Sequence, residues 1–277
     1  MVIQHNIAAI NSYRNLSINQ SALSKNLEKL SSGYKINRAG DDAAGLAISE
    51  TMRSQINGLN QAVNNANDAV GLIQTAEGAL TETHSMLQRM KTLTTQAANG
   101  TYTKTARDNI QAEINALNKE IGRIATTTEF NGEKPLSPAV AAGKTANLTF
   151  FIGASADKAN AMTVAQQAMT QTALKINTIS VKTTTLAFAA MKSVDAAIET
   201  VSSYRATLGA AQNRLEHTVN NLKVTSENIT SAESRIRDTD MADEITAYTK
   251  NNILLQAAQS MLSQSNAMPQ GVLSMLQ

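Results

Sequence analysis

Hydrophobic residues recur at every seventh position between residues 194 and 236. Valine, leucine or isoleucine holds that position without a gap, and a second set of positions between them is mostly alanine. This spacing gives a helix a narrow apolar seam, which other helices must cover. At 1.5 Å per residue, such a helix spans roughly 65 Å. The repeat comprises Val194, Val201, Leu208, Leu215, Leu222, Ile229 and Ile236.

A second long helix is predicted over residues 43–98. Its apolar residues follow alternating steps of four and three, and Glu77 and His84 occupy the two seam positions that lack an apolar residue. Asp41 and Asp42, just ahead of the segment, are of the type that caps a helix start. The predicted seam is Met52, Ile56, Leu59, Val63, Ala66, Val70, Ile73, Leu80 and Leu87.

Three further helices are predicted. Residues 1–30 have helical apolar spacing, and Gly33 is placed to end that helix in a left-handed conformation. Another helix starts near Thr105, with Asp108 as a partner in a capping box. The last helix follows a group of aspartates, Asp238, Asp240 and Asp243, that marks the end of the long repeat. The seam of the middle helix is Ile110, Ile114, Leu117, Ile121 and Ile124.

Helical periodicity is lost over residues 133–185. Residues 130–132 (FNG) are typical of a turn. A strand is predicted at residues 148–152, with residues 162–164 as its hairpin partner and 154–160 as the connection. The fold class is therefore mainly α, an antiparallel helical coiled-coil or bundle with a small β-hairpin region.

Composition narrows the function. Aromatic residues are 3% and charged residues 17% of the chain, the formal net charge is +2, and there is no cysteine. Dispersed basic residues argue against nucleic acid as a partner, and the missing cysteines exclude disulfides and thiolate chemistry. No apolar run reaches the ~18 residues of a membrane span. Residues 1–13 lack Lys and Arg, which does not fit a cleaved secretory signal.

The two ends of the chain carry almost no charge. Residues 251–277 contain no Lys, Arg, Asp, Glu or His, and residues 1–13 contain only His5. Amphipathic ends without charge are poorly suited to stay in water alone, so we expect them to fold against each other and against other copies. The candidate assembly residues are Ile3, Ile7, Ile10, Leu255, Leu262, Val272 and Leu273.

Candidate chemical sites all have simpler explanations. Residues 40–45 (GDDAAG) are weakly similar to a phosphate loop, but no strand precedes them. The aspartates at 238–243 lack the glycine of a calcium loop. His5, His84 and His217 match no metal-ligand or catalytic-triad spacing. With no nucleophile–base pair, we expect neither an enzyme nor a cofactor.

Residues 30–48 (LSSGYKINRAGDDAAGLAI) closely resemble bacterial flagellin. The resemblance covers residues 1–132 and 187–277. It continues in order through residues 64–68 (NNAND), 74–80 (QTAEGAL), 96–101 (QAANGT), 130–132 (FNG), 205–215, 232–238 (AESRIRD), 264–266 (QSN) and 269–274 (PQGVLS).

This resemblance implies a domain organisation. The ends, residues 1–44 and 239–277, would pair as the filament-core helices. Residues 45–186 would form N-terminal rod helices with a short variable β-hairpin region, and residues 187–238 the C-terminal rod helix. Because only residues 133–185 stand where larger members carry extra outer domains, the chain resembles a short flagellin.

The resemblance also implies a function and partners. Flagellins are structural proteins that self-associate into the extracellular filament used for motility. They are exported unfolded through the flagellar secretion apparatus, with a chaperone on the C-terminal segment, and the filament meets cap and junction proteins. Some are detected by Toll-like receptor 5, and the matching positions here are Gln88, Arg89, Leu93 and Glu113. The same residues could instead pack subunits together.

Three other interpretations remain open at this point. A hook–filament junction protein shares the paired terminal helices and is the nearest alternative. A flagellin-like enzyme would need a catalytic site within residues 133–185, where Glu133 and Asp157 are the only carboxylates and histidine is absent. A plain coiled-coil adaptor would not need a terminus without charge.

Overall fold

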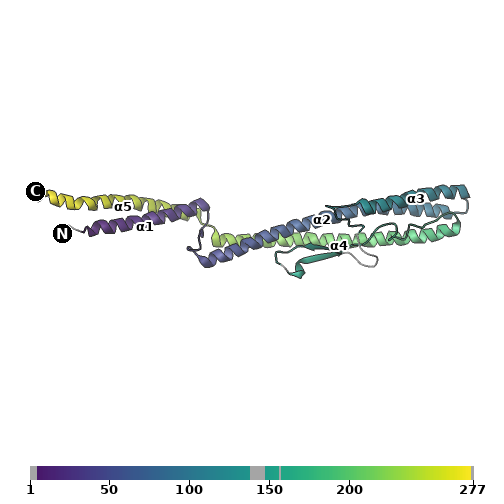
Figure 1. The fold of residues 1–277 in the computed structure, drawn as a ribbon, viewed down its shortest axis with the longest axis horizontal. Coiled ribbons are helices and arrows are strands. Elements are labelled where there is room, and N and C mark those ends of the chain that lie inside the picture. The colour runs from purple at the N-terminus through teal and green to yellow at the C-terminus, as the bar shows by residue number, and fades with distance from the viewer. Residues whose placement is uncertain (1–4, 138–146, 156, 276–277) are drawn as a thin grey trace. The chain divides into compact units, whose positions relative to one another are not determined.

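The computed structural model describes residues 5–137, 147–155 and 157–275. The described residues form two compact units, residues 57–226 and residues 5–56 with 227–275. Helices α2 (Ala43–Ala98) and α4 (Thr184–Arg237) contribute to both units. The other helices are α1 (Ile7–Ser32), α3 (Lys104–Thr127) and α5 (Met241–Met275), labelled in Figure 1. The predicted class, mainly helical with a small hairpin, is confirmed.

The seven-residue seam of α4 is the centre of the 57–226 unit. Val194, Val201 and Leu215 are completely buried, and Leu208 is 2% exposed. The alanines between them are buried as well, so α4 presents a continuous apolar strip to α2, α3 and the segment ahead of α4. The predicted seam is confirmed from Val194 to Leu222, whereas Ile229 and Ile236 are only half-buried.

The seam of α2 differs from the prediction at alternate positions. The set Ala66, Ile73, Leu80 and Leu87 is buried as expected, but the second set lies one residue earlier, at Ala62, Ala69, Ala76, Thr83 and Met90. Glu77 and His84 therefore lie beside the seam and not in it, and Glu77 reaches Arg205 on α4 at 3.5 Å. The shift is favourable because burying alanine costs far less than desolvating a carboxylate.

Helix α3 adds two buried amides that the apolar pattern did not predict. Gln111 donates to the carbonyl of Ile179 at 3.0 Å and accepts from the amide of Val181 at 2.7 Å. Seven residues along, Asn118 donates to the carbonyl of Ile176 at 2.7 Å. Ile110, Ile114 and Ile121 are buried as expected, whereas Leu117 and Ile124 are only half-buried. The two amides thus fix the backbone of residues 176–181, which we call the clamped segment, against α3.

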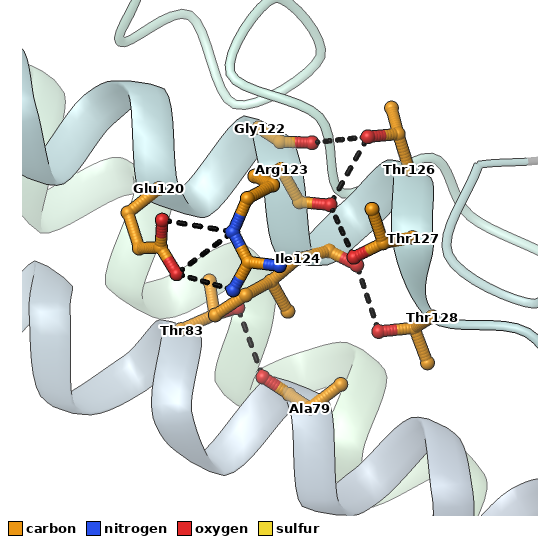
Figure 2. Close-up of polar contacts among 9 residues, drawn as sticks. All are labelled: Ala79, Thr83, Glu120, Gly122, Arg123, Ile124, Thr126, Thr127 and Thr128. Carbon is orange, nitrogen blue, oxygen red and sulfur yellow. Dashed lines mark hydrogen bonds and ion pairs between the residues drawn. The ribbon is translucent and has the colours of Figure 1, made fainter.

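Both ends of α3 are closed by threonine side chains. The helix begins at Lys104, and the hydroxyl of Thr103 accepts from the amide of Ala106, so the cap lies ahead of the predicted Thr105. Figure 2 shows the other end, where the hydroxyls of Thr126, Thr127 and Thr128 donate to carbonyls one turn back, at 2.7–3.0 Å. The carbonyl of Ile124 also accepts from the amide of Thr128 at 3.0 Å, so the hydroxyl of Thr128 adds a second hydrogen bond to it near the helix end.

The predicted hairpin is confirmed with its bounds shifted by one residue. Strands β1 (Asn147–Phe151) and β2 (Ala161–Ala165) pair antiparallel, joined by a connection that includes the short 3-10 helix η1 (Lys158–Asn160). Leu148 lies opposite Val164, and Phe150 lies opposite Met162. These four side chains face the helices, as the alternation of a half-buried ribbon requires.

In the other unit, α1 and α5 pack antiparallel, with both chain ends at the same end of the pair (Figure 1). Asn6, which caps the start of α1, also donates to the carbonyl of Ser265 at 2.8 Å, and Lys29 faces Glu244 at 4.0 Å. Gly33 ends α1 with φ +76°, as predicted. Asp240 caps the start of α5 by accepting from the amide of Ala242 at 2.8 Å.

Arg237 joins the end of α4 to the turn after α1 within this unit. Its guanidinium lies 4.7 Å from the ring centre of Tyr34 and donates to Glu50 at 2.6 Å. The carbonyl of Arg237 accepts from the amide of Lys35. Asp42 caps α2 through the amide of Gly45 at 2.9 Å. Of the two aspartates predicted to cap α2, only Asp42 does so. Asp41 accepts instead from backbone amides of the preceding turn.

We expect Gln111→Ala to lower the free energy of unfolding by about 1–3 kcal/mol, because the buried amide of Val181 and the partly buried carbonyl of Ile179 lose their partner. Chemical denaturation measures this change. Asn109→Ala, at an exposed position of the same helix, is the matched control. Equal stability of the two variants would show that the clamp contributes nothing.

A second expectation concerns Glu50. The hydrogen bond from Arg237, reinforced by its charge, lowers the pKa of Glu50 below the usual 4.5. The stability this provides is fully present above pH 4.5 and is lost as the pH falls through the lower, folded-state pKa. Glu50→Gln should therefore have a lower melting temperature than the unsubstituted chain at neutral pH, with a difference that shrinks on acidification. Glu82→Gln, at an exposed position of the same helix, should show no such convergence.

Candidate assembly surfaces

Helices α1 and α5 expose large apolar side chains along their outer faces. On α1, Ile10 is 58% and Tyr13 66% exposed, and no residue of this helix is buried. On α5, Ile253 is 61% and Met261 64% exposed. The remaining members of this exposed apolar set are Ile7, Ile18, Leu27, Met241, Ile245, Leu254 and Met268.

The predicted assembly residues fall into three groups. Ile7 and Ile10 are exposed on α1. Leu255 and Leu262 are half-buried, so the outer face of α5 is formed mainly by its exposed apolar residues and less by these two leucines. Ile3 lies outside the described residues, as do the side chains of Val272 and Leu273.

The absence of charge from residue 251 onward favours association of these faces with a protein partner. Apolar surface buried against a partner is favourable by ~25 cal/mol per Å², and along residues 251–275 no ionised side chain must lose its hydration in the process. An exposed apolar strip of this kind is typical of a protein–protein contact. Sequence reasoning found the strip from its composition, but the structure was needed to divide its residues between inner and outer faces.

The second predicted surface lies on α2 and α3. Arg89 on α2 is 55% exposed at its side chain and donates to Glu113 of α3 at 2.8 Å, where the Glu113 side chain is 43% exposed. Gln88 is exposed beside it and contacts His84 at 2.9 Å. Leu93 is 2% exposed and belongs to the helical core, so it does not share this surface with the other three residues.

Other kinds of site find no support in the geometry of the described residues. Across residues 5–137, 147–155 and 157–275, no three His, Asp or Glu side chains gather where they could hold a metal ion. Among the helices of those same ranges, none is both long and apolar enough to cross a membrane.

Two family models match the chain, one toward each end. Residues 3–141 match the family model of the bacterial flagellin N-terminal helical region, and residues 191–276 match that of the bacterial flagellin C-terminal helical region. The chain is 50% identical to the flagellin of Bacillus subtilis (strain 168) over 303 residues, covering all of both chains. It is 46% identical, again over the whole of both chains, to the flagellin of Halalkalibacterium halodurans.

A solved structure shares the fold at lower identity. It is described as a flagellar hook-associated protein of Vibrio parahaemolyticus and aligns with a TM-score of 0.59 at 13% identity, covering 72% of this chain and 100% of that one. At this identity the likeness concerns the fold alone. The two family models and the full-length relatives, taken with the paired terminal helices, show that this chain belongs to the bacterial flagellin family.

Proposed function

We propose that this chain is a structural subunit of the flagellar filament and polymerises through the outer faces of α1 and α5. The observation that carries the proposal is the exposed apolar set on these two helices, combined with the absence of charge from residue 251 onward. Relatives aligned over their full length are named flagellin, which favours a filament subunit over the hook–filament junction alternative. The role is structural and needs no catalytic group.

The energetics favour many weak contacts acting together. Full burial of an isoleucine or methionine side chain provides about 1.5–3 kcal/mol, so one that is about 60% exposed has about 1–2 kcal/mol left to gain. Assembly must offset the translational and side-chain entropy that each incoming subunit loses. The exposed apolar set runs along both helices, so several such gains occur in one addition step, and no single residue has to dominate.

Secretion and its partners form a finer part of the proposal. The chain would reach the cell exterior through the flagellar secretion apparatus, and the weakly buried α1 and α5 suit a protein exported unfolded. Before assembly, the apolar face of α5 would be covered by an export chaperone, because exposed apolar strips aggregate. Filament cap and junction proteins would meet the same two helices at the filament ends.

A second proposal concerns recognition by Toll-like receptor 5 at Gln88, Arg89 and Glu113. The exposed Arg89–Glu113 pair presents both a cation and a carboxylate on adjoining helices. Leu93 would support this surface from beneath. The same surface could also pack one subunit against another, and both roles are compatible.

The first test replaces Ile10, Ile253 and Met261 together by glutamine. We expect filament formation to be lost, because three exposed apolar contacts are replaced by amides that keep their water. Gln20→Asn with Gln259→Asn, at exposed positions of the same helices, is the matched control and should polymerise normally. Sedimentation and negative-stain electron microscopy after adding filament fragments as seeds measure the outcome. If the unsubstituted chain itself stays monomeric with seeds, the filament proposal fails.

The receptor proposal has its own test. Arg89→Ala should weaken receptor activation by about tenfold or more, as expected for a charged contact at the centre of an interface. It should leave folding nearly unchanged, because an exposed ion pair is worth about 0.2–1 kcal/mol. Arg123→Ala, which removes the exposed pair with Glu120 shown in Figure 2, is the control. Equal signalling by the two variants in a receptor reporter assay would contradict the proposal.

A further inference from the structure

A groove in the 57–226 unit gathers three of the four phenylalanines of the chain. Phe130, Phe150 and Phe151 line it together with Ala69 and Leu72 of α2, and its volume is about 490 Å³. Volumes of ~300–1,000 Å³ are typical of sites that accept a ligand or side chain. In a chain with so few aromatic residues, this concentration requires a physical reason.

A tight turn and the edge of strand β1 form two sides of the groove, with Phe150 and Phe151 on opposite faces of the strand. Asn131 and Gly132 both have positive φ, at 52° and 84°, and the backbones of Phe130 and Glu133 exchange two hydrogen bonds at 2.9 and 3.0 Å. This is the two-residue turn for which Asn-Gly is best suited. The ring of Phe130 then lies against Gly71 of α2, where an added Cβ would be 3.5 Å from it.

Strand β1 forms the opposite wall of the groove. Asn65 of α2 donates to the carbonyl of Phe151 at 3.0 Å, which ties the end of the strand to the helix. Phe150 packs against the helical core, whereas Phe151 is 43% exposed. The groove therefore has a fixed backbone and an aromatic surface still open to solvent.

The rim of the groove is acidic. Asp68 of α2 and Glu133 of the turn both line it, and both are exposed. An apolar floor with two carboxylates at its edge selects a partner that presents an apolar side chain beside a cation.

The same unit exposes an apolar side chain beside a cation at the start of α4. Phe188, the fourth phenylalanine, is 63% exposed. Lys192 is exposed one helical turn further on, on the same side of α4 as Phe188. We call Phe188 with Lys192 the aromatic knob.

The knob cannot reach the groove of its own chain. The ion pairs Lys91–Asp195, at 2.7 Å, and Glu77–Arg205 show that α2 and α4 run antiparallel in a fixed register. Phe188 therefore lies beside the end of α2 near residue 98, whereas the groove adjoins residues 65–72. At 1.5 Å per residue the two are roughly 40 Å apart along the helices.

We infer that the aromatic knob of one copy docks in the phenylalanine groove of another copy of this chain. Phe188 packs into the groove beside Phe130, and Lys192 faces Asp68 and Glu133. Because the knob and the groove are different surfaces of one molecule, the contact is head-to-tail and repeats without closing, as a filament requires. The inference rests on the proposed function and adds to it a contact outside α1 and α5.

Thiol crosslinking tests the contact directly, because the chain has no native cysteine. Phe188→Cys and Phe151→Cys chains are mixed, polymerised on seeds of unsubstituted filament and treated with a short bismaleimide. We expect a crosslinked dimer from the mixture and not from either chain alone. A single chain carrying both substitutions should give a ladder of multimers. Val224→Cys, at a 57% exposed position of the same unit, replaces Phe188→Cys in the control mixture.

A charge exchange tests the same contact without cysteine substitutions, in case the cysteine variants polymerise poorly on seeds. Lys192→Glu should slow filament elongation by roughly tenfold, since like charges then face each other. Adding Asp68→Lys and Glu133→Lys to the same chain should restore the elongation rate. Lys223→Glu, at an exposed position of α4, is the control and should elongate normally.

The outcomes separate this inference from the proposed function. Normal elongation by Lys192→Glu, or filaments whose crosslinking does not exceed the Val224→Cys control, overturns the knob-and-groove contact while leaving the filament role intact. Failure of the unsubstituted chain to polymerise on seeds overturns both.

Discussion

The apolar seam of α4 is the constraint on which the other elements of the 57–226 unit depend. Its buried positions recur every seven residues, so each element that covers the seam must place apolar atoms at the same positions along the axis of α4. Helix α2 does so with a column rich in alanine, which lets the two helices approach closely. Helix α3, the clamped segment and the hairpin cover the remainder. Once this seam is buried, the register of α2 against α4 is set, and the ion pair between Glu77 and Arg205 lies at its edge.

The sequence predicted the long helices and the hairpin because their signals are local and repeated. It placed half of the α2 seam one residue too late, because Val63 and Val70 are more apolar than the alanines at 62 and 69 that are buried. Pattern reasoning ranks residues by hydrophobicity, whereas close helix packing selects small side chains at the contact. Gln111 and Asn118 were missed for a related reason, since a polar residue is assigned to the surface unless its hydrogen-bond partner is known. Leu93 was grouped with exposed positions by resemblance, and its burial could not be read from the sequence alone.

The two units use different physical chemistry on their surfaces. The outer faces of α1 and α5 offer apolar area that carries no charge from residue 251 onward, which favours association but specifies register weakly. The 57–226 unit combines aromatic surface with like charges at its edge, the carboxylates of Asp68 and Glu133 beside the phenylalanine groove. Shape and charge of this kind discriminate between correct and incorrect alignments of a partner. A polymer needs both properties, a driving force and a means of choosing one arrangement.

The amide clamp on α3 has a consequence for how the family can diversify. Gln111 and Asn118 form hydrogen bonds with backbone groups of residues 176–181. Backbone groups do not depend on which side chains the segment carries. Asn177 and Thr178 in this segment are exposed to solvent. Their side chains can therefore change while the path of the chain is preserved, because the hydrogen bonds from α3 are made to backbone groups.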